Sequence, residues 1–396
     1  MDGSRTLWVV GWLLGALMVV PAAAQGSPQV VAVAKPPLWR QKTLNFSGGK
    51  ALLGLPDGAV APPHCSPEGT TFLDFYKETK TDGAPELYSV SPSGEVKHLL
   101  RTLPKDFTSI SIRDFFAAED TLVTLIKVEK RDDPNSEDSR VETRYFLSVS
   151  DLDGDGGKLL ELDLKFRPLK IAMLQSEEFI VLGWDDNNLV PVLALLKEDG
   201  TLRRFMDLDN RKYDGARELH EAYTSLKEAA SAPATKAVLR SLESAKFVPN
   251  GDQVLLTQPG SALAVVVLSA LGEESSVPLH LPAGFLLHDL LVSDAHSSWV
   301  VRAQAAEDFK KFATDHVVEN PRQRVFEVSS VNGSLIREFL FDKPHPMALT
   351  CAAHYKLSAI FDEPIPDASR TDADAGEKAA KAAGPTTQLV ISTISR

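Results

Sequence analysis

A short phrase of strands and turns recurs along this chain. It consists of a tight turn, an apolar strand, a second strand, a polar hairpin tip and a third strand. The phrase is clearest over Cys65–Leu100, where "CSPEGTTFLDFY" leads to "ELYSVSPSGEVKHLL", and part of it returns as "FVPNGDQVLLTQ". Apart from one longer gap, successive turns are spaced by about fifty residues, a period typical of stacked β-sheet units.

This rhythm predicts a mainly β fold, with residues 60–396 forming a β-propeller of six or seven blades and a central channel. Closing such a ring removes the exposed sheet edges that invite aggregation. Residues 25–59 form a Pro/Gly-rich lead-in with two short extended pieces, which we hypothesise to help close the ring. A multi-sheet β-sandwich array is the alternative architecture.

Two segments interrupt the rhythm. Residues 214–244 are rich in Ala, Glu, Lys and Leu, and Leu219, Tyr223 and Leu226 have the spacing of one helical face. We expect two helices there, with Pro233 in the first turn of the second. They would either decorate the ring or form a lid or docking element over one end of its channel. Residues 366–387 are of low complexity and predict a solvated loop.

The N-terminus has the pattern of a secretory signal. Arg5 precedes the apolar run Leu7–Val20, and Ala22-Ala23-Ala24 supplies the small residues of a cleavage site, so residues 1–24 form the predicted signal peptide. The protein is therefore expected to be exported, to the periplasm or the extracellular space. An uncleaved membrane anchor is the alternative, but this run is shorter than the roughly 20 residues that a spanning helix needs.

The chain has two cysteines, Cys65 and Cys351, each just before the first strong strand of a repeat. One lies in the first unit and the other in the last, and these units are neighbours in a closed ring. Disulfides persist in exported proteins, so we hypothesise that a Cys65–Cys351 bridge fastens the closure. Two buried free thiols are the alternative.

The formal net charge of −12 bears on the class of partner. Nucleic acid needs clustered Lys and Arg, and anionic membrane surfaces attract basic segments, so neither partner is expected. After signal cleavage no remaining segment approaches spanning length. The expected partner is an envelope protein or a small ligand.

At Ser66-Pro67-Glu68-Gly69, followed by "ELYSVSPSGEV", the chain resembles the TolB-like and WD-repeat-like bacterial β-propellers. Their blades carry a similar turn, an apolar strand and an "LY-V---G" hairpin. Residues 248–251 match part of this pattern. The other units keep the spacing of strands and turns but not these residue types. The resemblance implies the propeller fold and a bacterial source, and it carries no catalytic residues.

The segment "DLDGDGG" is the sharpest constellation of polar residues. Asp151, Asp153 and Asp155 occupy the first, third and fifth positions of a calcium loop, and Gly156 occupies the sixth. Leu162 stands where a bidentate Glu is needed, and the flanking segments are predicted strands instead of helices. The residues therefore suggest a weak structural Ca²⁺ site, with a simple polar hairpin tip as the alternative.

Other motifs indicate no catalytic residues and no cofactor. His64 adjoins Cys65, but neighbouring strand residues point to opposite faces, so a thiol–imidazole pair is not expected. His345 and His354 lack ligand partners for zinc. Taken together, the sequence favours an exported propeller that acts as a protein-binding or scaffold module of the bacterial envelope. A hydrolase or lactonase with its site at the propeller axis is the alternative.

Overall fold

The computed structural model describes most of the chain between residues 42 and 395. The described residues are 42–44, 63–66, 68–75, 86–99, 104–132, 140–154, 156–206, 226–258, 264–269, 271, 274–293, 297–315, 321–340, 348–354, 356–364 and 387–395. The predicted signal peptide, most of the 366–387 loop and the first part of the 214–244 insertion lie outside them.

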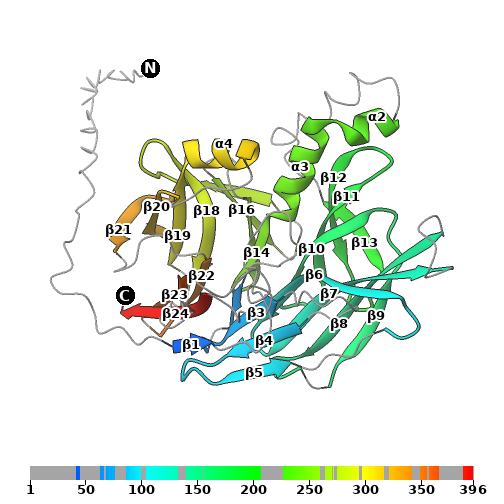
Figure 1. Cartoon of the computed structure of the whole chain (residues 1–396), viewed down its shortest axis with the longest axis horizontal. Coiled ribbons are helices and arrows are strands. Elements are labelled where there is room, and N and C mark those ends of the chain that lie inside the picture. The colour runs from blue at the N-terminus through cyan, green and yellow to red at the C-terminus, as the bar shows by residue number, and fades with distance from the viewer. Residues whose placement is uncertain are drawn as a thin grey trace, which may run out of the picture.

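These residues form six four-stranded antiparallel sheets, each built mainly from consecutive strands (Figure 1). The first sheet contains β2 (His64–Cys65), β3 (Thr71–Phe75), β4 (Glu86–Val90) and β5 (Val96–Leu99). The second contains β6 (Ser109–Ala118), β7 (Thr121–Arg131), β8 (Val141–Asp151) and β9 (Lys158–Leu162). The third contains β10 (Arg167–Met173), β11 (Phe179–Asp185), β12 (Val190–Leu196) and β13 (Leu202–Met206).

The remaining sheets repeat this arrangement, with one change in the last. The fourth contains β14 (Lys246–Asn250), β15 (Gln253–Thr257), β16 (Ala264–Ser269) and β17 (Glu274–Pro278). The fifth contains β18 (Phe285–Val292), β19 (Ser298–Ala305), β20 (Gln323–Ser329) and β21 (Leu335–Phe339). The sixth contains β22 (Ala348–Ala353), β23 (Lys356–Pro364), β24 (Thr387–Ser395) and β1 (Lys42–Leu44).

The six first strands form the inner wall of a ring. Each of β2, β6, β10, β14, β18 and β22 contacts the next along the chain, and β22 contacts β2. The outermost strand of the sixth sheet is β1, which comes from the N-terminal lead-in and pairs with β24. The predicted mainly β, propeller-like fold is therefore confirmed, and the structure differs from a β-sandwich array.

Apolar residues fill the space between neighbouring sheets. All eight residues of β19 are buried, and Trp184 and Trp299 are each only 1% exposed. Strands buried on both faces consist of nearly continuous apolar runs, as in "VVVL" of β16. One large cluster of buried apolar residues joins the second, third and fourth sheets.

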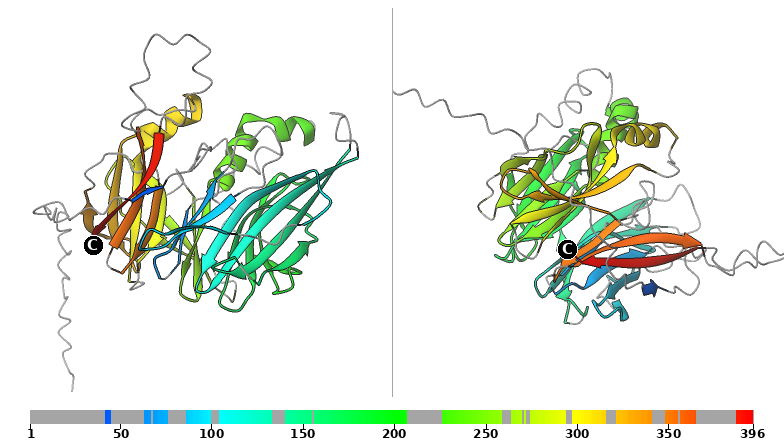
Figure 2. Two further views of the ribbon diagram at one scale, coloured as in Figure 1. Left: turned by 60° about the horizontal axis from the view of Figure 1, so that its bottom comes forward. Right: turned by 90° about the vertical axis from the view of Figure 1, so that its left-hand side faces the viewer.

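Three helices lie at one end of the ring, where they appear together in the left view of Figure 2. They are α2 (Leu226–Ser231), α3 (Pro233–Glu243) and α4 (Ala306–Asp315). Pro233 stands in the first turn of α3, where its missing N–H leaves no helical hydrogen bond unmade. Leu242 is fully buried, and Val238 and Leu239 pack against the main core. The second helix of the insertion is therefore anchored on the ring through its apolar face.

The join between the fourth and fifth sheets leaves no room for a side chain at Gly333. This residue has a positive φ of 65°, and an added Cβ would lie 1.8 Å from the carbonyl oxygen of Pro278. We expect Gly333→Ala to lower the free energy of unfolding by about 2–3 kcal/mol, because backbone must move to admit the methyl group. Urea unfolding would measure this. Gly251→Ala is the control: it shares a positive φ, but its Cβ meets nothing within 4 Å, so its loss should be clearly smaller.

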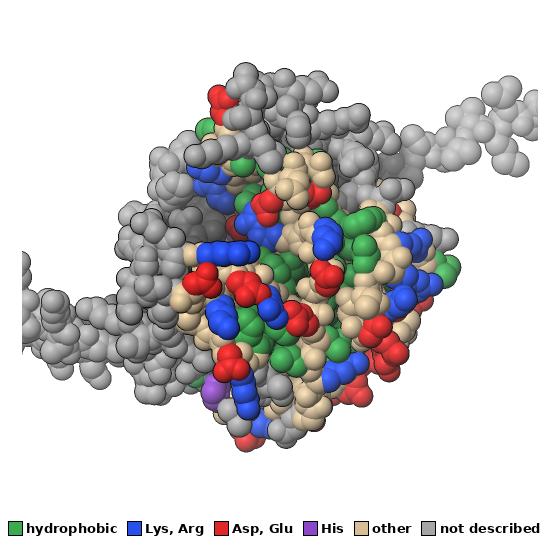
Figure 3. Space-filling model, turned by 90° about the vertical axis from the view of Figure 1, so that its right-hand side faces the viewer, with side chains coloured by type: hydrophobic (Ala, Val, Ile, Leu, Met, Phe, Trp, Pro, Cys, Tyr) green, Lys and Arg blue, Asp and Glu red, His purple; other side chains and the backbone are tan. Residues whose placement is uncertain are grey.

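Figure 3 shows one side of the molecule, on which basic and acidic side chains alternate around apolar ones. Nucleic-acid binding requires a continuous basic patch, which this face does not offer. No helix among the described residues is long and apolar enough to cross a membrane.

Candidate functional site

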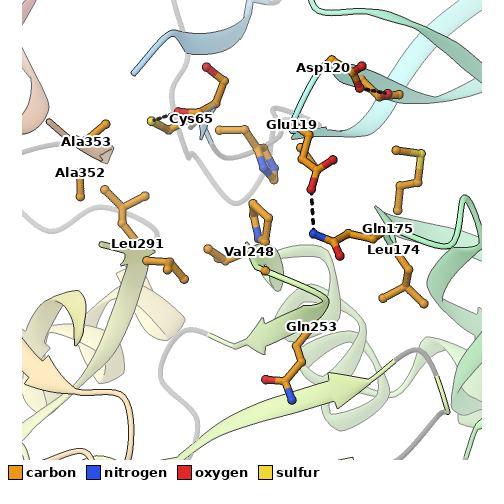
Figure 4. Close-up of a pocket in the computed structure, with 18 of the residues that line it drawn as sticks. Cys65, Glu119, Asp120, Leu174, Gln175, Val248, Gln253, Leu291, Ala352 and Ala353 are labelled. Carbon is orange, nitrogen blue, oxygen red and sulfur yellow. Dashed lines mark hydrogen bonds between the residues drawn. The ribbon is translucent and has the colours of Figure 1, made fainter. Parts of the chain in front are cut away.

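A cavity of about 390 Å³ lies at the axis of the ring (Figure 4). All six sheets contribute to its wall, mostly through the carboxyl ends of the inner strands and the turns that follow them. We call it the axial pocket. The residues used below are His64 and Cys65 at the end of β2, Glu119 after β6, Gln175 after β10, Lys246 and Val248 on β14, Leu291 on β18 and Ala352 on β22.

The pocket combines apolar walls with a polar rim. Val248, Leu291 and Ala352 supply apolar wall from three sheets. At the rim the side chains of Glu119 and Gln175 point toward each other, and the Gln175 amide donates a hydrogen bond of 2.7 Å to the Glu119 carboxylate (Figure 4). Both residues are exposed, so their hydrogen bond links the second and third sheets at the solvent-facing side of the pocket. This mixture suits a small molecule that is partly apolar and partly polar.

His64 is a buried polar side chain that lines the pocket. It is only 3% exposed, and its ring packs edge-on against Phe115 and Phe116, with centroids 4.9 and 5.7 Å away. Its ring makes no hydrogen bond to any described residue. Burial, reinforced by the positive charges of Lys246 and Lys170, holds the pKa of His64 well below its usual value. The imidazole is therefore neutral at neutral pH, with one nitrogen able to donate and the other to accept.

Charged side chains join the inner strands next to this histidine. Lys170 on β10 lies 3.5 Å from Asp114 on β6, and Lys246 on β14 lies 3.2 Å from Asp289 on β18. All four side chains are buried. The structure therefore places a buried titratable side chain on each of five inner strands, counting His64 on β2.

Backbone irregularities aim the two aspartates at the neighbouring sheets. The register of β6 shifts immediately before Asp114, and that of β18 shifts immediately before Asp289. A β-bulge of this kind rotates the following side chain out of the regular alternation. The Asp114 carboxylate accepts a hydrogen bond of 2.8 Å from the backbone N–H of Ile171, and Asp289 accepts one of 3.2 Å from that of Leu349. Each aspartate thus links its own sheet to the next sheet through a backbone hydrogen bond, and it forms an ion pair with a lysine on a neighbouring inner strand.

The two aspartates differ in their electrostatic surroundings. Burial raises the pKa of Asp114 to about 6, and Lys170 only partly offsets this. Burial also acts to raise the pKa of Asp289, but Lys246 and Arg302 together hold it below its ordinary value. Asp289 is therefore the firmly ionised carboxylate of the axis, whereas Asp114 takes up a proton under mildly acidic conditions.

His288 lies beside the second of these aspartates. Its Nδ1 is 2.8 Å from the Arg302 guanidinium, and its ring lies near that of Phe309 on α4. Burial and the Arg302 charge lower the pKa of His288 to about 3. Because the unfolded chain binds a proton at His288 below about pH 6.5 and the folded chain does not, folding becomes less favourable as the pH falls from 6.5 towards 3.

We expect His288→Gln to reduce this acid sensitivity. Relative to the variant, the wild type should lose up to about 1.4 kcal/mol of unfolding free energy for each pH unit below 6.5. Urea unfolding at pH 7.5 and pH 5.0 measures the difference. Asp114 and His64 titrate in both proteins, so their contributions cancel. Equal losses in both proteins would show that His288 is protonated in the fold.

The structure joins Cys65 and Cys351 by a disulfide, with their Cα atoms 5.1 Å apart. The bond links β2 to β22, the first and last inner strands. Cys65 also lines the axial pocket, so the bond lies at the pocket wall. His64 and Cys65 thus both border this cavity, which sequence reasoning about alternating strand faces did not anticipate, because β2 ends at Cys65.

The suggested calcium loop is only partly described. Asp155 lies outside the described residues, the Asp153 carboxylate accepts a hydrogen bond from Lys97, and Asp151 accepts one from the Asp153 backbone. Among the described residues no group of three His, Cys, Asp or Glu side chains could hold a metal ion. The calcium site therefore stays a prediction. If the site exists, the melting temperature of the protein should be higher in millimolar calcium than in chelator, and equal melting temperatures would contradict it.

The helices do not cover the axial pocket. α2 and α3 precede the start of β14, and α4 joins β19 to β20, so all three lie at the end where inner strands begin. The pocket lies at the end where these strands finish. The described part of the helical insertion, residues 226–244, is therefore not a lid over this pocket, although a docking role at its own end stays open. Its ion pair between Glu243 and Arg113 ties α3 to β6.

No protein-family model matches the chain, and no curated protein is similar to it in sequence. Solved structures of similar shape include the endosialidase of phage phi92, at 8% identity and a TM-score of 0.48, covering 90% of this chain and 69% of that one. Another is an α-L-arabinanase of Penicillium chrysogenum, at 11% identity and a TM-score of 0.46, covering 87% and 98%. A third is an exo-β-1,3-galactanase of Clostridium thermocellum, at 8% identity and 0.38, covering 76% and 64%.

Likenesses at this level of identity and TM-score assign neither a family nor an activity to the chain. The expected membership of the TolB-like or WD-repeat-like family gains no support, because no family model matches. The propeller-like fold rests on the six sheets of the chain itself.

Proposed function

We propose that this protein is an exported, propeller-like binding protein that holds a small molecule in its axial pocket. The observation that carries the proposal is the pocket itself: a cavity of about 390 Å³ to which all six sheets contribute. Ligand sites in proteins are commonly apolar cavities of about 300–1,000 Å³ with a few converging polar groups. His64, Lys246, Glu119 and Gln175 are those groups here.

Export is the untested part of this proposal. It rests on the predicted signal peptide, and the disulfide supports it because such bonds persist outside the cytosol. The alternative role as an envelope scaffold rests on the sequence alone, whereas the pocket favours a site at the propeller axis. A small ligand is therefore the partner that we put first.

A thermal-shift screen of metabolites tests the proposal. The library should span sugars, amino acids, carboxylates, phosphates and nucleosides. Gln253 lines the pocket from the start of β15, so the larger indole of Gln253→Trp should abolish each stabilising hit. Val331 is 83% exposed in the turn between β20 and β21 and does not line the pocket, so Val331→Trp should keep the hits. An absence of hits, or hits that persist in Gln253→Trp, would overturn the proposal.

Hydrolysis of the bound molecule is the second candidate function. It is favoured because groups capable of general acid–base chemistry, His64, Lys246 and Glu119, line one cavity. The lowered pKa of His64 makes it a weak base until a bound anion or carboxylate raises that pKa. If the protein hydrolyses a hit from the screen, His64→Gln should abolish turnover while the hit still raises the melting temperature. Turnover unchanged in this variant would exclude His64 as the base.

A further inference from the structure

The floor of the axial pocket presents two nitrogen-bearing side chains from opposite parts of the ring. His64 comes from the first sheet and Lys246 from the fourth, and both border the cavity while being at most 4% exposed. Lys246 places one of its three N–H groups toward Asp289, 3.2 Å away. His64 hydrogen-bonds to no described residue. A neutral imidazole that borders a cavity can exchange a hydrogen bond with a molecule bound there.

The charges acting on this imidazole favour a negative ligand. Lys246 and Lys170 both act on the His64 ring, and their positive charges are felt there although each lysine also pairs with a buried aspartate. A neutral imidazole can donate its N–H to an anionic oxygen without first taking up a proton. A lysine ammonium group beside it adds a charge-assisted hydrogen bond to the same anion. Inside a low-dielectric cavity such charge-assisted hydrogen bonds count for more than they do in water.

The rest of the pocket limits what this anion can be. Its walls carry apolar side chains such as Val248, Leu291 and Ala352, which suit a carbon skeleton. Its rim carries the exposed carboxylates of Glu119 and Glu177, which repel a second negative charge at the mouth. A dianionic phosphate is disfavoured on both counts, whereas a single carboxylate on an uncharged skeleton is accommodated.

We infer that the axial pocket binds a small monocarboxylate whose carboxylate accepts hydrogen bonds from Lys246 Nζ and the His64 ring, with its uncharged part against the apolar wall. The inference rests on the proposed function, because it names the ligand class of the same pocket. It also predicts a response of the protein: a carboxylate beside His64 offsets the two lysines, so binding raises the pKa of the imidazole.

Matched acids and amides test the ligand class. Isothermal titration at pH 7 should compare butyrate, phenylacetate and N-acetyl-leucine with their primary amides, which keep the shape and remove the charge. At least one acid should bind tenfold or more tightly than its amide, and phenyl phosphate should bind more weakly than phenylacetate. Lys246→Met should reduce the preference for the acid to less than threefold, whereas Val331→Ala, at an exposed residue that does not line the pocket, should retain it.

A second measurement covers the case in which Lys246→Met fails to fold, since the variant leaves Asp289 without its lysine. In the wild type, NMR of imidazole-labelled protein should show the His64 pKa rising by at least one unit when the tightest acid saturates the site. His64→Gln identifies the resonance. An unchanged His64 pKa in the saturated protein would overturn the inference even where the acid binds.

The outcomes separate this inference from the proposed function. If amides bind as well as acids, or if only neutral molecules from the metabolite screen are blocked by Gln253→Trp, the pocket is a ligand site and the carboxylate inference is wrong. If nothing in either set binds in a manner sensitive to Gln253→Trp, both fail.

Discussion

Asp289→Ala should lower the free energy of unfolding by about 3–5 kcal/mol, because it leaves a buried charge without its counter-ion. The Asp289 carboxylate lies 3.2 Å from Lys246 and 4.0 Å from Arg302, and it also accepts the backbone N–H of Leu349. The substitution therefore removes the counter-charge of Lys246 and one hydrogen bond between the fifth and sixth sheets. Urea unfolding followed by tryptophan fluorescence measures the loss.

Two further variants show whether the stability loss of Asp289→Ala comes from leaving a buried charge unpaired. Asp289→Asn keeps an oxygen that can accept the Leu349 N–H but loses the charge, so its cost should lie between those of the wild type and Asp289→Ala. Glu142→Ala breaks the exposed pair with Arg144 and should change stability by less than about 1 kcal/mol. A small loss in Asp289→Ala, similar to that in Glu142→Ala, would mean that water or Lys246 movement relieves the buried charge.

Much of the fold could be predicted from the sequence because turns carry strong local signals. The turn residues with positive φ at Gly69, Glu119 and Gly251 mark the hairpins between first and second strands, and they fall where the repeated phrase begins. Closure by the N-terminal lead-in follows from the same reasoning, since a ring needs a strand to complete its last sheet. α4 was missed, because its ten residues lie within a segment that reads only as a charged insertion.

The candidate site could not be assembled from the sequence for two physical reasons. Its residues come from six separate units, so no local motif joins them. In addition, β-bulges at Asp114 and Asp289 redirect these side chains, and a bulge is not visible in the alternation of residue types. One signal was present: charged residues next to apolar runs within predicted strands, as in "DFFAA", "LKIAM" and "HDLLV". Such a charge is costly to bury alone, so each implies a partner on a neighbouring strand.

Ring closure should depend on the disulfide as well as on strand pairing. β1 pairs with β24 at the outer edge of the sixth sheet, whereas the Cys65–Cys351 bond joins the innermost strands of the sixth and first sheets. β2 has only two residues, so few backbone hydrogen bonds hold it to β3. The bond spans 286 residues of chain, and cross-links that close long loops restrict the unfolded state strongly.

Cys65→Ser should therefore lower the free energy of unfolding by about 2–5 kcal/mol. Cys351→Ser and the double variant should lose the same amount as each other and as Cys65→Ser, because all three remove one bond, and chemical reduction of the wild type should reproduce the loss. Thiol titration of the denatured protein supplies the direct test, with no reactive thiol before reduction and two after it. Two thiols before reduction would show that the ring is closed by the pairing of β1 and by packing alone.

Because Cys65 also lines the axial pocket, loss of the bond should weaken ligand binding there while leaving the helices at the other end in place.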